Sequence, residues 1–583
     1  MIKKLASCIR EYKKDSILTP VFVALEVVLE CIIPYVIALL VNNIQRGCGL
    51  GVIVKYGLVV FVMACLSLLC GSLSGYFCAR ASSGFAKNLR KDLFYKVQGF
   101  SFANIDKFST SSLVTRLTTD VTNVQNAYMM IIRIAVRCPF MLIFALVMSI
   151  LMSPSLAMTY LFIVPVLAIG LGLMIKISMP IFNRLFKKYD ALNESVQENV
   201  NGIRVVKAYV REDYEINKFN EASQELKRSF TRVEKILAFN SPLMQFCMYV
   251  TMTAVSLFGA GMIIRSGGSA FNVGDLSSMI TYSMQILMSL MMISMIFVMV
   301  TMSVASARRI CEVLDDESTI KNPENAVITV KDGSVDFDNV DFAYSADAEK
   351  NVLEGIDLHI KSGQTIGVIG GTGSSKSSLI QLIPRLYDVT GGSVKVGGRD
   401  VREYDIKTLR DQVAVVLQKN VLFSGTIKEN LRWGDENASD EELERVCRLA
   451  QADEFVQKFP EKYDTYIEQG GTNVSGGQKQ RLCIARALLK KPKILILDDS
   501  TSAVDTKTDA LIRKAFAEEI PDTTKIIIAQ RISSVQEADQ IVVLEGGRIN
   551  GVGTHEELLE NNEIYREVYT SQNKNSGEED TNA

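Results

Sequence analysis

Residues 365–383, TIGVIGGTGSSKSSLIQLI, read as an apolar strand, a glycine-rich turn and the start of a helix. Within them, Gly370–Ser377 fits the P-loop pattern G-x-x-x-x-G-K-S, except that Ser375 occupies the position of the last glycine. Such a turn presents backbone N–H groups and the positive end of a helix to phosphates. Lys376 adds positive charge, and the Ser377 hydroxyl can bind Mg²⁺. The stretch therefore predicts an α/β domain that binds a nucleotide.

The composition divides the chain into two parts. It has 583 residues, of which 48% are hydrophobic, and long uncharged runs occur only up to about residue 307. We expect a transmembrane domain over 1–322, a nucleotide-binding domain over 330–570 and a disordered polar tail over 571–583. The net charge of −2 gives no reason to expect a nucleic acid partner. The 11 cysteines form no CxxC pair and are interpreted as free thiols.

The first part predicts an all-α membrane domain. The first apolar run is too long for a signal peptide and is expected to stay as a span. The loops after the second and fourth runs are long and basic, which places them and both termini in the cytoplasm. The lipid bilayer is therefore a partner, and a cell (plasma) membrane is the expected location. Six runs are long enough to span it: about 16–44, 56–79, 125–153, 155–175, 236–264 and 276–307.

Charged residues interrupt two of the predicted spans. Glu26 and Glu30 lie four residues apart in the first span, and Arg133 and Arg137 lie four apart in the third. Each pair shares one helical face, at a similar depth. Charges inside a membrane require partners or a wet cavity, so either a structural ion-pair cluster or contact with a substrate explains them.

The last span carries methionines at helical spacing. Their flexible, polarizable side chains suit a pore surface that accepts many apolar shapes, but packing against helices or lipid explains them equally well. The stripe consists of Met284, Met288, Met291, Met295, Met299 and Met302.

Further motifs follow the P-loop in a fixed order. They are Gln418 in VVLQKN, the run VSGGQKQR at 474–481, and KILILDDSTSAVDT at 493–506, an apolar strand that ends in two aspartates. This set strongly resembles an ABC-type ATP-binding domain. With six spans ahead of it, the chain resembles an ABC exporter half-transporter of the multidrug type.

The resemblance implies roles for particular residues. Tyr344 would stack on adenine, although a core tyrosine is the alternative interpretation. Ser377, Gln418 and Asp498 would contact or support Mg²⁺, and Asp505 would lie at the dimer interface. The ATP-binding set also includes Gly370, Gly371, Thr372, Gly373, Ser374, Ser375, Lys376 and Ser378. The signature loop, which would contact ATP held by the opposite domain, is Val474, Ser475, Gly476, Gly477 and Gln478.

Two positions depart from the family pattern. Asp499 stands where active family members have a catalytic glutamate, and Gln530 stands where they have a switch histidine. Aspartate is one methylene shorter, and a misplacement of about 1 Å can lower a rate roughly 10²-fold. We expect a site that binds Mg-ATP but hydrolyses it slowly. The missing glutamate and histidine would come from a second half-transporter, in a heterodimer.

Two segments in the basic loops, 109–120 and 201–213, resemble the coupling helices of this family, although plain solvated loops would also fit. The expected function is ATP-driven export of a small amphipathic substrate by alternating access. A peptide or lipid substrate, or a non-transporting ATP-gated regulatory or channel subunit, are the alternatives.

Overall fold

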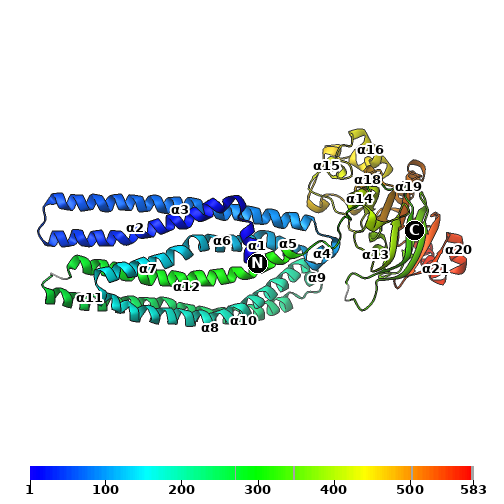
Figure 1. Cartoon of the computed structure of the whole chain (residues 1–583). Coiled ribbons are helices and arrows are strands. Elements are labelled where there is room, and N and C mark those ends of the chain that lie inside the picture. The colour runs from blue at the N-terminus through cyan, green and yellow to red at the C-terminus, as the bar shows by residue number, and fades with distance from the viewer. Residues whose placement is uncertain (269–270, 346–347, 501–502, 580–583) are drawn as a thin grey trace. The chain divides into compact units, whose positions relative to one another are not determined.

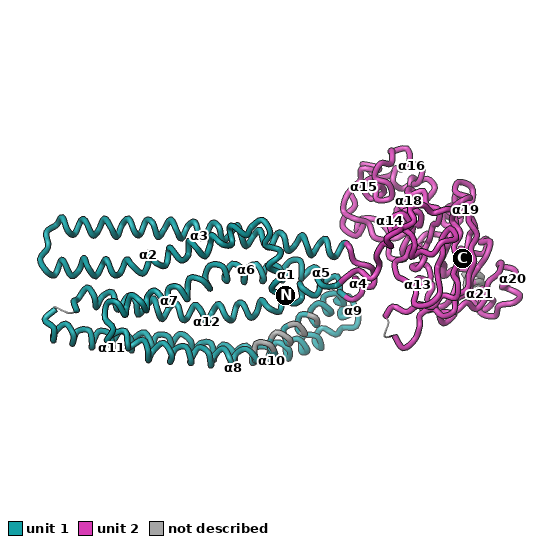
Figure 2. Tube along the Cα trace, viewed as in Figure 1, with its two compact units in different colours: residues 1–98, 108–316 teal, residues 99–107, 317–583 magenta. Residues whose placement is uncertain are grey.

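The computed structural model describes residues 1–268, 271–345, 348–500 and 503–579. The chain forms two compact units (Figure 2). Unit 1 comprises Met1–Gln98 and Phe108–Asp316, and unit 2 comprises Gly99–Lys107 and the chain from Glu317 onward.

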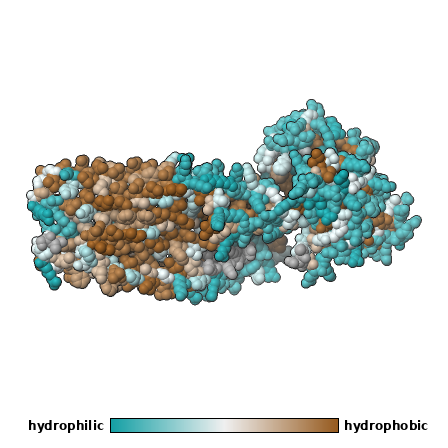
Figure 3. All heavy atoms as spheres, viewed as in Figure 1, coloured by the Kyte–Doolittle hydropathy of each residue, from teal (hydrophilic) through white to brown (hydrophobic). Residues whose placement is uncertain are grey.

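Unit 1 is entirely helical (Figure 1). Six helical segments among the described residues are long and apolar enough to cross a membrane, and each predicted span falls within one of them to within a residue. Apolar side chains cover much of the visible face of these helices, whereas the visible surface of unit 2 is mainly polar (Figure 3). The helices are α1 Ile2–Ser7, η1 Arg10–Tyr12, α2 Lys13–Gln45, α3 Leu50–Gln98, α5 Thr110–Thr115, the π-helical turn η2 Arg116–Asp120, α6 Val121–Ile132, α7 Ile134–Met152, α8 Pro154–Asn201, α9 Ile203–Ala208, α10 Glu212–Ala238, α11 Asn240–Ser266 and α12 Val273–Asp315.

Caps and close approaches fix the start of α12 against α2. Asn272 and Asp275 form a capping box that satisfies backbone N–H groups at this end. The amide of Asn42 joins α2 to it, donating to Asp275 Oδ1 and accepting from the Gly274 N–H, both over 3.0 Å. A Cβ atom on Gly274 would lie 2.3 Å from the carbonyl oxygen of Ala38, so only glycine fits there.

Unit 2 is an α/β domain with a six-stranded sheet in the order β12-β11-β3-β10-β9-β6, a four-stranded antiparallel sheet β2-β1-β4-β5 and a small pair β7-β8. Its strands are β1 Val335–Phe342, β2 Leu353–Ile360, β3 Thr365–Gly370, β4 Gly391–Val396, β5 Arg399–Asp400, β6 Val413–Val416, β7 Gly425–Thr426, β8 Tyr466–Ile467, β9 Ile494–Asp498, β10 Thr524–Ile528, β11 Gln540–Glu545 and β12 Arg548–Gly553. Its helices are α4 Phe102–Lys107, α13 Lys376–Gln381, η3 Val401–Glu403, α14 Ile406–Gln412, α15 Ile427–Leu431, α16 Asp440–Leu449, α17 Asp453–Val456, η4 Lys462–Asp464, η5 Gln469–Gly471, α18 Gly476–Leu489, α19 Thr506–Glu519, η6 Ile532–Ser534, α20 His555–Asn561 and α21 Glu563–Glu579.

The register of the large sheet brings three strand ends together. β10 runs parallel to both β3 and β9, and Ile528 pairs with Val368 on one side and with Asp498 on the other. All five residues of β9 and of β10 are buried, as expected for central parallel strands. The loops after β3, β9 and β10 therefore leave the sheet at one edge, where α/β sheets bind ligands.

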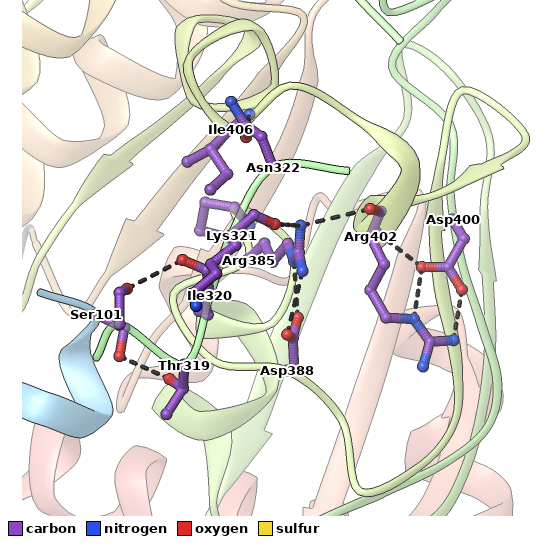
Figure 4. Close-up of polar contacts among 12 residues, drawn as sticks. Ser101, Thr319, Ile320, Lys321, Asn322, Arg385, Asp388, Asp400, Arg402 and Ile406 are labelled. Carbon is purple, nitrogen blue, oxygen red and sulfur yellow. Dashed lines mark hydrogen bonds and ion pairs between the residues drawn. The ribbon is translucent and has the colours of Figure 1, made fainter. Parts of the chain in front are cut away.

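The division between the units differs from the expected boundary at residue 322. Residues 317–322 belong to unit 2, together with 99–107, because polar contacts tie these segments to each other and to the domain. The hydroxyls of Ser101 and Thr319 share a hydrogen bond of 2.8 Å, and Arg385 donates to the carbonyl of Lys321 over 3.4 Å (Figure 4). Arg385 is itself held by Asp388 through a 2.7 Å ion pair.

The polar C-terminal segment also differs from expectation. Residues 571–579 were expected to be disordered, but they continue α21 as far as Glu579; residues 580–583 lie outside the described part. The start of this helix is anchored by Tyr565, which is fully buried. Further along, Gln572 accepts a hydrogen bond from the N–H of Ile532 over 2.9 Å. The polar composition of the segment gives no sign of this order, because the order depends on the burial of Tyr565 and on the hydrogen bond between Gln572 and Ile532.

Candidate nucleotide-binding site

The P-loop joins β3 to α13, as the sequence predicts. Lys376 lies over the turn and donates from Nζ to the carbonyls of Gly370 (2.7 Å) and Gly371 (2.9 Å). A Cβ atom on Gly371 or Gly373 would meet nothing within 4 Å, whereas one on Gly370 would lie 2.3 Å from a carbonyl oxygen of β11. The turn therefore packs against the sheet at its start and presents an open backbone further on, which fits a phosphate cradle.

Ser375 adopts a left-handed backbone conformation, with φ of 71°. This is the conformation for which glycine is favoured, and a side chain there costs about 1–2 kcal/mol. The left-handed backbone explains why the P-loop pattern has a glycine at this position. Ser375 keeps the same shape of the turn, at some cost in stability.

The expected Mg²⁺ residues lie next to the lysine. Asp498, at the end of β9, is 4% exposed, and its Oδ1 accepts a hydrogen bond of 3.2 Å from the Ser377 hydroxyl. Burial raises the pKa of Asp498, while the hydrogen bond from Ser377 lowers it. Burial likewise lowers the pKa of Lys376. A hydroxyl and a carboxylate side by side are the hard oxygen ligands that Mg²⁺ prefers, so these residues fit that ion.

Asp499 and Gln530 are bonded to each other. Gln530 lies in the loop after β10 and donates from Nε2 to Oδ2 of Asp499 over 2.7 Å. Asp499 has φ of 48°, and its N–H donates to the carbonyl of Ile528 over 3.0 Å. Burial raises the pKa of Asp499, and hydrogen bonds from Gln418 and Gln530 lower it. The three predicted residues thus meet at the sheet edge, beside the P-loop.

Tyr344 follows β1 and is 47% exposed, so it is not part of the buried core. Its hydroxyl shares a 2.8 Å hydrogen bond with Ser378 of α13. Tyr387 packs edge-on against it, with ring centroids 5.1 Å apart. An exposed, braced aromatic ring near the P-loop helix suits stacking on a base.

Tyr387 and Asp106 were not identified from the sequence. The Tyr387 hydroxyl donates to Oδ2 of Asp106 in α4 over 2.5 Å, and the ring packs against Phe102 of the same helix at 6.0 Å. Burial is the main cause that raises the pKa of Tyr387, followed by its hydrogen bond to Asp106. No pattern signals this pair, because its members are 281 residues apart in the chain.

The signature loop begins α18. Ser475 and Gln478 form a capping box, in which the Ser475 N–H donates to Gln478 Oε1 over 2.9 Å. A Cβ atom on Gly477 would lie 2.8 Å from the carbonyl of Ala503, so glycine permits close packing on the segment that leads to Asp505. Val474 is buried, whereas Gly476 is exposed. Asp505 caps α19 by accepting from the N–H of Thr508 over 3.0 Å.

The segments that resemble coupling helices both contain short helices, α5 in 109–120 and α9 in 201–213. Both belong to unit 1. A different loop segment, α4, packs within the nucleotide-binding unit; it ends two residues before the first of them. Phe102 and Ala103 pack against the core of that unit, and Asn104 donates to the carbonyl of Glu317 over 2.9 Å.

A six-span membrane unit joined to a P-loop unit with a signature loop defines a transport ATPase. The chain belongs to the ABC transporter family: residues 16–310 match the ABC transporter transmembrane region and 353–502 match the ABC transporter domain. With one unit of each kind, it is a multi-pass half-transporter that requires a second ABC half.

Two relatives and one solved structure support the assignment. The uncharacterized ABC transporter ATP-binding protein YfiB of Bacillus subtilis (strain 168) is 35% identical over 578 residues, covering 99% of this chain and 100% of that protein. Rv1273c of Mycobacterium tuberculosis (strain H37Rv), also uncharacterized, is 35% identical and covers 92% of each chain. The structure of a bacterial Atm1-family ABC exporter with ATP bound superposes with a TM-score of 0.82 at 22% identity, covering 97% of this chain and 98% of that one. The last comparison defines the fold.

Proposed function

We propose that this chain is the degenerate-site subunit of a heterodimeric exporter, which moves amphipathic compounds out of the cytoplasm by alternating access. In this proposal the protein lies in the plasma membrane with both termini in the cytoplasm. The observation that carries it is the hydrogen bond between Gln530 and Asp499, because these residues replace the family's histidine and glutamate and hold each other.

The elements that would bind ATP remain in place. Tyr344 would receive the base, Lys376 and the backbone of the P-loop would hold the phosphates, and Ser377 and Asp498 would hold Mg²⁺. The ion would supply charge neutralisation at the phosphates. The open cradle at Gly371 and Gly373 supports this assignment.

Hydrolysis at this site would be slow for two reasons. The carboxylate of Asp499 is one methylene short of a glutamate, so it is badly placed to orient an attacking water. Gln530 also occupies one of its oxygens. Glutamine can donate a hydrogen bond but cannot carry the charge of a protonated imidazole.

The signature loop would act on the partner's ATP. Its serine, both glycines and its glutamine are present, and the capping box with the close approach at Gly477 fixes their backbone. A partner with glutamate and histidine at these positions would then provide the catalytic residues of the active site, and the signature loop of this chain would complete that site. ATP would remain longer at this chain's own P-loop.

The test is the ATPase rate of the purified chain, alone and with a partner half-transporter. The chain alone should bind ATP and turn it over slowly, and the pair should be fast. Loss of the pair's activity on changing the partner's glutamate, but not on Asp499→Asn, would support the division of roles. Fast turnover of the chain alone that Asp499→Asn abolishes would refute it.

Peptide or lipid export, and an ATP-gated regulatory or channel role, are the alternatives. The hydrogen bond between Gln530 and Asp499 is the observation that favours a gated role, because a site that binds ATP and hydrolyses it slowly would act as a switch. Net transport against a gradient by the reconstituted pair would exclude a channel, and the transported compound would decide the substrate class.

A further inference from the structure

One of the two arginines in the third span is neutralised within the chain. Arg137, in α7, donates from Nη1 to Oε1 of Glu26 over 2.9 Å and from Nη2 to both carboxylate oxygens of Glu30 over 2.8 Å. Both glutamates belong to α2, so this part of the predicted cluster joins two helices. The ion-pair interpretation holds for these three residues.

Arg133 behaves differently. Among the described residues, its side chain makes no hydrogen bond or ion pair; it lies against α3, where a Cβ atom on Gly75 would be 3.8 Å from Nη1. An arginine in a spanning segment without a carboxylate partner is costly, and such residues mark pathways for polar substrates.

The helix is interrupted at this arginine. α6 ends at Ile132 and α7 begins at Ile134, while Arg133 has φ of −113° and ψ of −65°. Pro139, less than two turns later, has no N–H to donate to the carbonyl of residue 135, so the helical hydrogen bonding is weakened again just after the interruption.

Both arginines line a cavity of about 480 Å³ in unit 1. They are the charged members of its lining, which does not include Glu26 or Glu30. The remaining wall is largely apolar and comes from α7 and α12, with Met141, Met284, Met288 and Met292. The methionine stripe therefore divides, since Met291 instead packs against a neighbouring cluster of buried residues that contains Leu287.

Gln285 also lines the cavity, and its Oε1 is buried without a hydrogen-bond partner among the described residues. An unsatisfied amide in a roomy, mixed cavity is a group that a ligand can satisfy. The cavity thus combines a free guanidinium, an unsatisfied amide and a flexible apolar wall.

We infer that this cavity binds an amphipathic organic anion, with its acidic head on Arg133 and its apolar body on the methionines. The inference rests on the proposed export function and specifies its substrate class. Met side chains adapt to several shapes, so the apolar part is loosely specified. The head is specified by charge, because guanidinium binds carboxylate and phosphate through paired hydrogen bonds.

The charged lining favours an anionic head over a cationic one. Arg133 and Arg137 are the charged members of the lining, whereas Glu26 and Glu30 are not part of it. A carboxylate or a phosphate head would therefore be attracted, and the binding test distinguishes these two heads.

The test measures binding to the full chain in phosphatidylcholine nanodiscs, using radiolabelled decanoate, decyl phosphate and decyltrimethylammonium. Arg133→Gln should weaken decanoate binding at least about tenfold, the effect of losing hydrogen bonds to a charged group, and should not weaken binding of the cation. Arg265→Gln, a change of the same kind at an exposed site in α11, should bind decanoate normally. Gln285→Glu should weaken decanoate binding and strengthen that of the cation.

Equal loss of all three probes in Arg133→Gln, or unchanged decanoate binding in both cavity variants, would overturn the inference. If Arg133→Gln does not fold, Gln285→Glu alone decides, through the opposite responses of anion and cation. Displacement of decanoate by phosphatidylglycerol in parent nanodiscs, but not by phosphatidylcholine, would identify an anionic lipid as the source of the head group. Because binding needs neither hydrolysis nor a partner, its failure is distinct from failure of the heterodimer proposal.

Discussion

Gln530 donates a hydrogen bond to the carboxylate of Asp499 over 2.7 Å, so the two residues that we propose stand in for the family's histidine and glutamate are in direct contact. In that proposal, either replacement alone would slow hydrolysis. The two residues act together, because the side-chain amide of Gln530 holds the carboxylate of Asp499 in place. The two positions should therefore be changed together to recover activity.

The first prediction concerns that reversal. Asp499→Glu combined with Gln530→His should raise the ATPase rate of the purified chain by at least about tenfold, because the longer carboxylate can reach the attacking water. Gln530→His alone should have little effect, since the acid stays short. Steady-state phosphate release measures the rates, with Lys376→Ala as the inactive control. If the double variant stayed as slow as the parent, another feature such as Ser375 would be the cause.

The second prediction concerns pH and Asp498. Burial raises the pKa of this carboxyl in the folded chain, so its contribution to stability is present below the unfolded value and is lost as pH rises through the folded value. In the absence of nucleotide and Mg²⁺, Asp498→Asn should therefore raise the melting temperature at pH 7.5 and have little effect near pH 3.5. With Mg-ATP bound, the parent should instead have the higher melting temperature, because only the parent has the Asp498 carboxylate oxygen that would hold Mg²⁺. A variant less stable than the parent at pH 7.5 without ligand would contradict the prediction.

Much of the fold follows from local sequence signals. Six long apolar runs predict six spanning helices, and the order of strand, glycine turn and helix predicts the P-loop domain. The P-loop, Gln418 and the two aspartates also meet as expected, because parallel strands end at one edge of the sheet. Each of these features can be predicted from a short stretch of sequence, without knowledge of contacts between distant residues.

The parts that the sequence did not predict depend on long-range contacts. The hydrogen bond between Asp106 and Tyr387 joins a membrane-loop segment to the nucleotide-binding unit, and no local pattern marks either residue. The role of Arg133 could not be separated from that of Arg137 by spacing alone. Only the positions of Glu26 and Glu30 show which arginine is paired.

The third prediction tests that long-range contact. Tyr387→Phe removes the hydroxyl that donates to Asp106 but keeps the ring that packs on Phe102 and Tyr344. Loss of one hydrogen bond to a charged group, worth about 1.5–3 kcal/mol, should speed local amide exchange in 100–107 by about tenfold or more. Hydrogen–deuterium exchange of the full chain measures this effect.

Tyr404→Phe is the matched control for that experiment. Its hydroxyl donates to the carbonyl of Val396 over 2.7 Å, a contact that involves no residue of α4. It should lower stability without a selective change in 100–107. Equal exchange of that segment in both variants would show that the Tyr387 hydroxyl does not hold α4.

The fourth prediction concerns the C-terminal helix. Gln572 donates to the carbonyl of Gln530 over 2.8 Å and accepts from the N–H of Ile532 over 2.9 Å, so α21 holds both ends of the loop that places Gln530. Gln572→Ala removes both bonds and should speed amide exchange at 530–532, while exchange in the buried strand β10 stays unchanged. Gln572→Glu should have an intermediate effect, because glutamate can still accept from Ile532 but cannot donate to Gln530. A polar tail with no structural role would give the same exchange in all three proteins, whereas a graded series would show that Gln572 holds the backbone at Gln530.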